Sequence, residues 1–514
     1  MTANVVDIDG GPLTVRQVAD VARRSAVVAL NPAAVNKMQV SRDVVEKAVA
    51  EGAVVYGVTT GFGALAQVRV ADADAAGMQL SLLRSHAAGV GDPLDDEIVR
   101  AMLLLKARTL SAGFSGVRPV IVQGLLGFLN KGLHPLVPRQ GSVGASGDLA
   151  QLAHLALPLV GEGSARVGGE VLSGKLALKA IGAKPLTLKH KEGLALLNGT
   201  EGMLSIGCLA LCDAVNLAKA ADIVCAMSVE ALLGSDGPFD PRLHDIRPHP
   251  GQTDSAANLT ALLAGSPIIA SHRDSDHAVQ DAYSVRCAPQ VHGACRDVIN
   301  FAQQVFEREL ASVTDNPVVL VDSQEIRSTG NFHGEPLGFA LDFLAIALSE
   351  LGSISERRTD RLLDPNHSSG LPPFLTKFAG TDSGFMLSQY TQAALVAENR
   401  INCVPATADT IPTSGSQEDH VSMGWNAALK LRRVVDNLRL ILAVEALCAA
   451  QGIDFREPLK PARATAAAHA NVRAVVKHMD HDRVLGPEIT SIAEDVIASG
   501  TLVGKVEETI GALA

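Results

Sequence analysis

The sequence predicts a mainly α protein whose core is a bundle of long helices. Three observations favour this fold class. Apolar residues recur every three or four positions over long Pro-free stretches, 47% of the 514 residues are hydrophobic while 19% are charged, and turn-forming residues gather in the loops between these stretches. Because such spacing puts apolar side chains on one helix face, neighbouring helices can bury them. The composition excludes a disordered or fibrous chain.

Four long helices are expected. The first follows Asn198, the second covers 291–305, the third starts just after Pro336, and the fourth runs from about Gln417 to Gln451. Their expected apolar faces are, in order, Leu204, Cys208, Leu211 and Val215; Val291, Cys295, Val298, Ala302 and Val305; Leu337, Leu341, Leu344, Leu348 and Leu351; and Leu431, Val434, Val435, Leu438, Ile441 and Leu442.

Loops rich in Gly, Pro and Asn precede these helices, and a small hairpin is expected within 161–190. The loops cover 131–147, 234–254, 313–335 and 403–416. We expect an N-terminal domain over 1–200, and the long-helix bundle with the C-terminal helices over 201–514.

Charge and targeting signals exclude several classes of protein. The formal net charge is −11 and no basic run is present, so nucleic acid is not an expected partner. The N-terminus lacks the charged and apolar regions of a signal peptide, and no apolar run approaches the length of a membrane span. Seven cysteines without a C-x-x-C pair indicate reduced thiols. We therefore expect a soluble, cytoplasmic protein with no membrane partner.

No metal site is expected, although the chain has fifteen histidines. The H-E-x-x-H motif is missing from the sequence, and the close histidine pairs have no Cys or Glu partner at ligand spacing. These pairs are His244/His249, His272/His277 and His478/His481.

The most unusual segment is Gly141-Ser-Val-Gly-Ala-Ser-Gly-Asp-Leu149, a glycine-rich loop that leads into a predicted helix. Asp148 is at the expected N-cap. No lysine follows to make a phosphate-binding loop, and Gly-Ala-Ser-Gly-Asp does not match G-x-S-x-G. A plain glycine-rich cap loop is the alternative interpretation.

The tripeptide Ala145-Ser146-Gly147 favours a chemical role. Its small residues allow the Gly147 amide nitrogen to reach the Ala145 carbonyl and close a ring. Loss of water from that ring and from the Ser146 side chain leaves an exocyclic methylidene group, which is an electrophile. At a helix N-terminus, negative charge that develops during attack on this group is stabilised.

With these residues the sequence resembles the aromatic amino acid ammonia-lyase family, and the resemblance covers nearly the whole chain. It rests on the loop above and on further segments in family order. They are Tyr56-Gly-Val-Thr-Thr-Gly-Phe-Gly63, Leu196-Leu-Asn-Gly-Thr200, Arg247-Pro-His-Pro-Gly-Gln252, Gln280-Asp-Ala-Tyr-Ser-Val-Arg-Cys287, Thr314-Asp-Asn-Pro317, Gly330-Asn-Phe332 and Gln417-Glu-Asp-His-Val-Ser-Met423.

The resemblance implies a lyase/fumarase-like helical architecture and a homotetramer with active sites shared between subunits. It also implies that Ala145, Ser146 and Gly147 form 4-methylidene-imidazole-5-one (MIO) autocatalytically, with no external cofactor. The substrate amine adds to this group, a base removes a β-proton, and ammonia leaves to give an α,β-unsaturated acid. Tyr56 and Tyr283, two of only three tyrosines in the chain, resemble the catalytic tyrosines of the family.

Four further residues have roles that the resemblance implies. Arg286 resembles the residue that pairs with the substrate carboxylate. Asn198 and Gln280 resemble residues that hydrogen-bond the substrate and the ring, and Phe332 resembles a residue of the pocket wall. The alternatives are a surface salt bridge for Arg286, a turn for Asn198 with Gly199, and a core aromatic for Phe332.

Two positions indicate the substrate. His86 occupies a place where phenylalanine-specific relatives have an apolar residue, and histidine- and tyrosine-specific members have His. Glu418 resembles the histidine-specific form, in which a carboxylate hydrogen-bonds the imidazole. The alternative for Glu418 is an acid in the first turn of a long helix, with Ser416 and Asp419 as a capping pair.

We therefore expect an amino acid substrate, L-histidine, with trans-urocanate as the product of a step in histidine catabolism. Three departures from the usual histidine-lyase form leave the substrate open: Ala282, Glu201, and the segment Cys287-Ala-Pro-Gln290. The alternatives are a tyrosine ammonia-lyase, an MIO aminomutase, and a catalytically silent helical scaffold.

Overall fold

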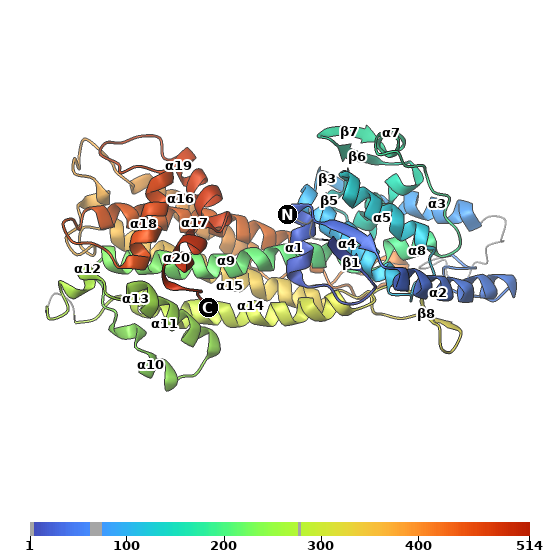
Figure 1. Cartoon of the computed structure of the whole chain (residues 1–514), viewed down its shortest axis with the longest axis horizontal. Helices are drawn as coiled ribbons and strands as arrows, with labels where there is room; N and C mark the ends of the chain where they lie inside the picture. The colour runs from blue at the N-terminus through green and yellow to red at the C-terminus, as the bar shows by residue number, and fades with distance from the viewer. Residues whose placement is uncertain (1–4, 62–74, 276–278) are drawn as a thin grey trace. The chain divides into compact units, whose positions relative to one another are not determined.

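The structure, a computed structural model, describes residues 5–61, 75–275 and 279–514. These residues are mainly helical, which confirms the expected fold class (Figure 1). They form two compact units. Unit 1 comprises Met1–Cys212, Gln303–Leu341 and Pro405–Leu429, and unit 2 comprises Asp213–Ala302, Asp342–Val404 and Lys430–Ala514. The units join segments far apart in the sequence, whereas the expected division at residue 200 follows chain order and stays a prediction about domain organisation.

Unit 1 is a layer of short and medium helices with small sheets at its edges. Its helices are α1 (Val15–Arg24), α2 (Pro32–Ala50), α3 (Ala75–His86), α4 (Asp96–Ser111), α5 (Pro119–Lys131), α6 (Leu149–Ala156), η3 (Leu157–Val160), α7 (Gly174–Ala180), α8 (Glu192–Leu197) and η6 (Ser414–Ser416). Helix α4 is its centre, because every side chain from Ile98 to Ser111 is buried. Burial on all sides matches its apolar stretch Ala101–Leu105.

The strands of unit 1 form two- and three-stranded sheets within the described residues. The pairs are β1 (Val5–Ile8) with β2 (Val27–Leu30) in parallel, β3 (Val90–Pro93) with β5 (Pro138–Gln140), and β8 (Val318–Leu320) with β9 (Glu325–Arg327); the larger sheet is β4 (Leu133–Pro135), β6 (Ser164–Val167) and β7 (Glu170–Ser173). Strands β6 and β7 are the predicted hairpin, with Ser164 opposite Ser173. Gly168 and Gly169 form its turn with positive φ.

The four expected long helices are present as α9 (Glu201–Ala231), α14 (Ala288–Ala311), α15 (Glu335–Leu363) and α17 (Gly424–Asp454). Their predicted apolar faces are largely buried: the five leucines of α15 and the six apolar residues of α17 have no exposed surface. The expected burial of Val215 in α9 is wrong, since 39% of this residue is exposed. Its position continues the spacing of the apolar face, but the residue is only partly covered.

The start of α17 corrects the sequence analysis, which placed it near Gln417. The helix begins at Gly424, because residues 417–423 make other contacts. The backbones of Thr413 and Glu418 pair with each other, and Met423 has a left-handed φ of 52° while its N–H donates to the Val143 carbonyl. These contacts are incompatible with continuous i to i−4 helical bonding.

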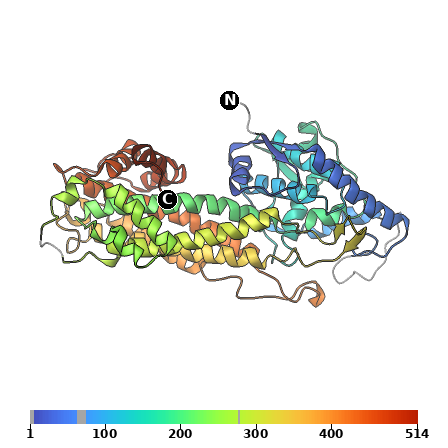
Figure 2. The same cartoon turned by 60° about the horizontal axis from the view of Figure 1, so that its bottom comes forward.

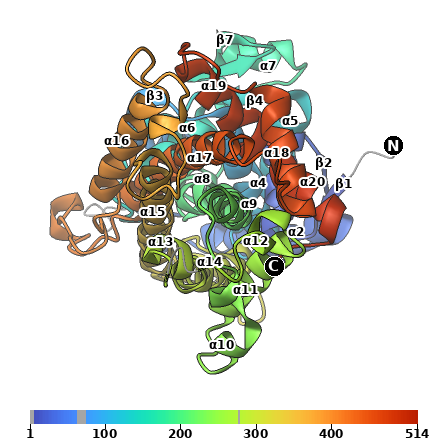
Figure 3. The ribbon, with the colours of Figure 1, turned by 90° about the vertical axis from the view of Figure 1, so that its left-hand side faces the viewer.

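Unit 2 surrounds its parts of the long helices with shorter helices. The long helices run side by side in Figures 1 and 2, and Figure 3 views them end-on. The surrounding helices are η4 (Gly237–Phe239), α10 (Pro241–Asp245), α11 (Pro250–Leu263), α12 (Pro267–Ala270), α13 (Tyr283–Arg286), η5 (Pro373–Leu375), α16 (Met386–Asn402), α18 (Arg463–Val475), α19 (Gly486–Ser491), η7 (Ile492–Ala498) and α20 (Thr501–Ile510).

A buried polar network lies within unit 2. The Asp222 carboxylate accepts from His292 Nδ1 and from the Arg296 guanidinium, each at 2.7 Å. Arg358, fully buried, pairs with Glu445 at 2.5 Å and donates to the Ser284 carbonyl at 3.3 Å. Burial alone would raise the pKa of Asp222. Its charge partners and hydrogen bonds outweigh burial and lower this pKa to about 2.

Helix α15 is long and apolar enough to cross a membrane by length and composition, which the sequence analysis did not expect. However, 72% of its most apolar window is buried inside the structure. A core helix passes the same test, because burial in protein selects the same residues as burial in lipid.

None of the seven cysteines forms a disulfide bond in the structure. Burial raises the pKa of Cys225 to about 12 and that of Cys448 further. Such thiols stay protonated and act as small apolar side chains.

We expect Asp222→Asn to lower the free energy of unfolding by about 3–5 kcal/mol, because the buried Arg296 loses its charge partner. The Asp222 pKa is lowered from 3.8 to about 2. Its contribution is therefore complete above pH 4 and is lost as the pH falls through this range. Urea unfolding from pH 7 to pH 3 measures both effects. Glu508→Gln, which removes a surface acid with 67% side-chain exposure, is the control and should leave the midpoint unchanged.

Candidate active site

The Ala145-Ser146-Gly147 loop lies in unit 1, at the entrance to α6. Ala145 and Gly147 are buried and Ser146 is partly exposed. The loop forms a parallel bridge with a second glycine-bearing turn, Gly147 with Gly199, which connects α8 to α9. Two segments of backbone therefore lie against each other where the reactive tripeptide is expected.

Close packing around this loop demands glycine. A Cβ atom on Gly147 would lie 1.8 Å from the Gly199 carbonyl oxygen, and one on Gly144 would lie 2.1 Å from Ser422 Oγ. Both residues have positive φ, 74° and 71°. The close approach and the backbone conformation each exclude a larger residue here.

Hydrogen bonds hold the residues around the tripeptide. The Gly199 N–H donates to the Ser146 carbonyl at 3.3 Å, and the Asp148 N–H donates to the Gly199 carbonyl at 2.9 Å. Ser142 Oγ donates to the Gly147 carbonyl at 3.2 Å. From the far side of the loop, buried Ser422 donates to the Gly144 carbonyl at 3.3 Å. The ends of the tripeptide are thus fixed in position.

Two backbone groups within the tripeptide are left out of these bonds. Among the described residues, no hydrogen bond engages the Gly147 N–H or the Ala145 carbonyl. These are the nucleophile and the carbonyl that the expected ring closure would join. Buried backbone groups normally have partners, so this pair is available for the reaction.

Asp148 occupies the predicted N-cap position of α6, but its side chain does not cap that helix. It is fully buried and accepts from the Met203 N–H, at the start of α9, at 2.8 Å. Burial raises the pKa of Asp148 to about 8, although backbone donors at the helix N-terminus oppose the shift. The carboxyl group next to the tripeptide is therefore largely protonated at neutral pH.

Further ionisable groups gather at the same end of α9. Glu201 is buried and pairs with buried Lys106 at 3.0 Å, and Lys106 also donates to the Asn198 carbonyl. Glu309 accepts from the Thr200 hydroxyl at 2.6 Å, and burial raises its pKa. Glu201, which departs from the usual family residue, is thus part of a paired structural cluster.

His86 ends helix α3 and is partly buried. Its Nδ1 lies 3.0 Å from the Leu82 carbonyl oxygen, so Nδ1 carries the proton and Nε2 has a free lone pair. Burial lowers the pKa of His86, while the charge of Glu418 acts in the opposite direction. His86 is therefore a neutral imidazole whose Nε2 can accept a hydrogen bond.

Glu418 is not in a helix, which removes the alternative interpretation as a helix-start acid. It is partly buried, and Thr413 Oγ1 donates to its carboxylate at 2.9 Å. The backbone pairing of Thr413 and Glu418 fixes the segment. His86 and Glu418, the two positions expected to indicate the substrate, both belong to unit 1, and the charge of Glu418 acts on His86.

The other candidate residues of unit 1 lie in turns. Asn198 is buried at the C-terminus of α8 and donates to the Asn316 carbonyl at 2.7 Å. Tyr56 begins a turn that Thr59 braces by donating to the Ala53 carbonyl at 2.6 Å. Phe332 is partly buried in the turn before α15. The end of the Tyr56 motif, residues 62–63, lies outside the described residues.

The remaining candidates belong to unit 2, where they cluster at α13. Tyr283 begins this helix and is 71% exposed, and the Arg286 guanidinium carbon lies 4.7 Å from the centre of its ring. Arg286 Nε is buried with no hydrogen-bond partner among the described residues. Gln280 is exposed and borders a polar hollow of about 240 Å³, which His272 also lines. His277, the other residue of the His272/His277 pair, lies outside the described residues.

Several residues that shape the site were not predicted from the sequence. Ser142 and Ser422 hold the loop, and Lys106 holds the turn after Asn198. Both serines lie within motifs that the sequence analysis identified, but a serine has no sequence signal for the carbonyl that it contacts. Lys106 lies in an apolar helix, where a lone lysine indicates a buried partner.

Comparison with known proteins shows which family this chain belongs to. A family model described as aromatic amino acid lyase matches residues 13–474. The chain is 50% identical over 506 residues to a histidine ammonia-lyase from Gloeobacter violaceus, covering 98% of both proteins, and 51% identical over 505 residues to one from Streptomyces griseus, again covering 98% of both.

Solved structures agree with this placement. The crystal structure of histidine ammonia-lyase from Trypanosoma cruzi matches with a TM-score of 0.91 at 40% identity, covering 98% of this chain and 96% of that one. Tyrosine aminomutase from Streptomyces globisporus matches with a TM-score of 0.93 at 38% identity, covering 99% and 100%.

The helical fold and the loop at α6 therefore define a carbon–nitrogen lyase. The chain belongs to the aromatic amino acid lyase family. That family membership agrees with the resemblance found in the sequence.

We expect Gly144→Ala to block maturation of the tripeptide, because the new Cβ would collide with Ser422 Oγ. Gly168→Ala is a matched control: this hairpin glycine also has positive φ, 59°, but a Cβ there meets no atom within 4 Å. Both variants acquire a similar backbone strain of about 1 kcal/mol. Intact mass spectrometry measures the outcome. Equal maturation of the two variants would contradict the role assigned to the close packing.

Proposed function

We propose that this protein eliminates ammonia from L-histidine to give trans-urocanate. The observation that carries the proposal is the presence in unit 1 of both His86, whose Nε2 can accept a hydrogen bond, and the Glu418 carboxylate, whose charge acts on His86. A neutral substrate imidazole has one N–H donor, which either of these two acceptors can bind, and a protonated imidazole has one N–H for each of them. Full-length relatives at about 50% identity that are named histidine ammonia-lyases support this assignment.

We also propose that Ala145, Ser146 and Gly147 mature into the MIO group without an external cofactor. The residues present fit this group: glycine is required at Gly147, its amide and the Ala145 carbonyl are unpaired, and the flanking carbonyls are held. When formed, the group supplies an electrophile for the substrate nitrogen. Ring closure expels one water and dehydration of Ser146 expels a second.

The residues of unit 1 orient the substrate side chain. His86 Nε2 accepts from one imidazole N–H, and when the ring is protonated the Glu418 carboxylate accepts from the other N–H and balances the charge of the ring. Asn198 hydrogen-bonds the substrate or the ring, and Phe332 forms part of the pocket wall. This arrangement holds the Cβ–H bond in one orientation, so that proton removal and nitrogen departure occur in a fixed geometry.

The residues of unit 2 act on the amino acid portion. Arg286 binds the substrate carboxylate in a bidentate pair, and its unpartnered Nε supports this role. Tyr283 and Tyr56 are the candidate bases for the β-proton, and Gln280 contributes a hydrogen bond to the ring or substrate. In the overall reaction the Cβ–H and Cα–N bonds break, a carbon–carbon double bond forms, and ammonia leaves.

Tyrosine chemistry is the second candidate function. Ala282 is typical of tyrosine-type lyases, and a tyrosine aminomutase is among the structures that this chain resembles. An aminomutase returns ammonia to the β-carbon and gives a β-amino acid, so analysis of products separates it from a lyase. We further propose a cytoplasmic homotetramer whose active sites are shared between subunits.

Purified protein should convert L-histidine to urocanate, followed by ultraviolet absorbance, and should be lighter than the encoded chain by two water molecules. Ser146→Ala should keep the unmodified side chain and lose activity, because alanine has no hydroxyl group to eliminate. Coumarate from L-tyrosine alone would contradict the assignment of histidine as substrate. An unmodified mass with no product from histidine, tyrosine or phenylalanine would indicate a silent scaffold.

Glu418→Gln should lower kcat/KM for L-histidine by about 10–10²-fold, the range for loss of a hydrogen bond to a charged group. Turnover of L-tyrosine, measured as any residual activity, should change far less because a phenol has no second ring nitrogen. Asp419→Asn is the matched control, since it removes the adjacent, exposed carboxylate. If Glu418→Gln left histidine turnover intact, Glu418 would have no part in the mechanism.

A further inference from the structure

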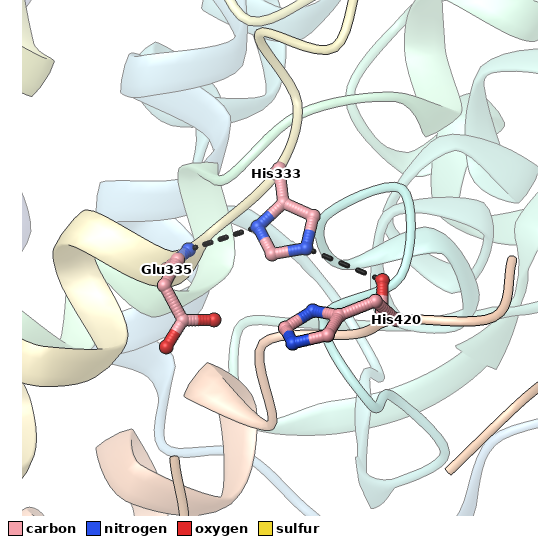
Figure 4. Close-up of side chains that lie close together, drawn as sticks. All are labelled: His333, Glu335 and His420. Atoms are coloured by element: carbon pink, nitrogen blue, oxygen red, sulfur yellow. Dashed lines mark hydrogen bonds between the residues drawn. The ribbon is translucent and has the colours of Figure 1, made fainter. Parts of the chain in front are cut away.

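A second cluster of ionisable side chains lies in unit 1. Glu335 begins α15, His333 lies two residues before it, and His420 comes from the segment before α17 (Figure 4). One ligand atom from each residue lies within 4.8 Å of the others. The sequence analysis did not find this group, because it searched for close histidine pairs and His420 lies 87 residues after His333.

The hydrogen bonds of His333 prepare one nitrogen for a ligand. Its Nε2 lies 3.3 Å from the His420 carbonyl oxygen, which can only accept, so Nε2 carries the proton. The lone pair is therefore on Nδ1, which receives only a long contact of 3.4 Å from the Glu335 N–H. A metal-bound histidine typically donates its second N–H to a backbone carbonyl in this manner.

The other two side chains add complementary donors. Glu335 Oε2 is buried and has no hydrogen-bond partner among the described residues. The ring of His420 lies 5.8 Å from that of His333, measured between centres, and His420 is exposed. Figure 4 shows the Glu335 carboxylate and the His420 ring on the same side of His333. An ion can thus reach the cluster from solvent.

We propose that His333, Glu335 and His420 form a binding site for a divalent transition-metal ion, with Zn²⁺ as the best fit. Two neutral imidazoles and one carboxylate are a preferred donor set for Zn²⁺, and water completes the tetrahedron. Donor atoms around tetrahedral zinc lie roughly 3.3 Å apart. The ligand atoms of the cluster lie within 4.8 Å of one another, which is wider than this. Rotation of the exposed His420 side chain and the partly buried Glu335 side chain brings them closer.

The donor set also predicts selectivity. Nitrogen ligands favour Zn²⁺, Co²⁺ and Ni²⁺, whereas Mg²⁺ and Ca²⁺ prefer sites made of oxygen atoms. Mg²⁺ in large excess should therefore not displace Zn²⁺. The cluster contains none of the three residues Ala145, Ser146 and Gly147, so metal content and the mass change of tripeptide maturation are separate measurements.

The test is equilibrium dialysis of the chelator-treated full-length protein against Zn²⁺, with metal content measured by mass spectrometry. We expect one Zn²⁺ per chain, and at least about 10-fold weaker binding in His333→Ala, His420→Ala and Glu335→Gln. His249→Ala removes another exposed histidine and is the matched control, with unchanged affinity. Co²⁺ in place of Zn²⁺ should give the intense visible absorption of a tetrahedral site.

Two results would overturn the proposal. One is stoichiometric binding that all three substitutions leave unchanged, which would place the metal elsewhere. The other is the absence of stoichiometric binding to the unaltered protein. Thermal unfolding without metal separates these outcomes from misfolding: the variants should melt with the unaltered protein, and Zn²⁺ should raise the melting temperature of the unaltered protein alone.

Discussion

The close approach of two glycine-bearing backbone segments, Gly147 and Gly199, is the constraint on which the candidate site depends. No side chain fits between them, so the bond between the Asp148 N–H and the Gly199 carbonyl can form only with glycine at this bridge. The bridge ties the loop before α6 to the turn before α9. The reactive tripeptide is thus attached to the longest helices of the fold.

The start of α9 connects this loop to the charges around it. Asp148 and Glu201, which are buried, and Glu309, which is partly buried, are acids near one helix N-terminus, where backbone N–H groups and the helix dipole favour negative charge. Lys106 balances one of them, and protonation of Asp148 relieves the repulsion among the rest. Burial of so many acids is possible only because each has a specific partner or a raised pKa.

A comparable arrangement stabilises unit 2. There the Asp222, His292, Arg358 and Glu445 side chains are buried together, and Arg358 donates to the Ser284 carbonyl next to Tyr283. In each unit, therefore, a buried polar network contacts a segment that carries candidate site residues. Such networks fix backbone positions more sharply than apolar packing, because each hydrogen bond requires a particular distance and direction.

The sequence by itself determined the fold class, the positions of the long helices and the family, because apolar periodicity and a rare tripeptide are local properties of the chain. It misplaced the start of α17, since the Thr413–Glu418 pairing depends on contacts that spacing does not encode. It also left open whether Glu418 was a helix-start acid. Only the tertiary structure decided that question, the neutral tautomer of His86, the buried partners of Glu201 and the grouping of His333, Glu335 and His420. These features join residues that are distant in the sequence, and burial together with hydrogen bonding decides them.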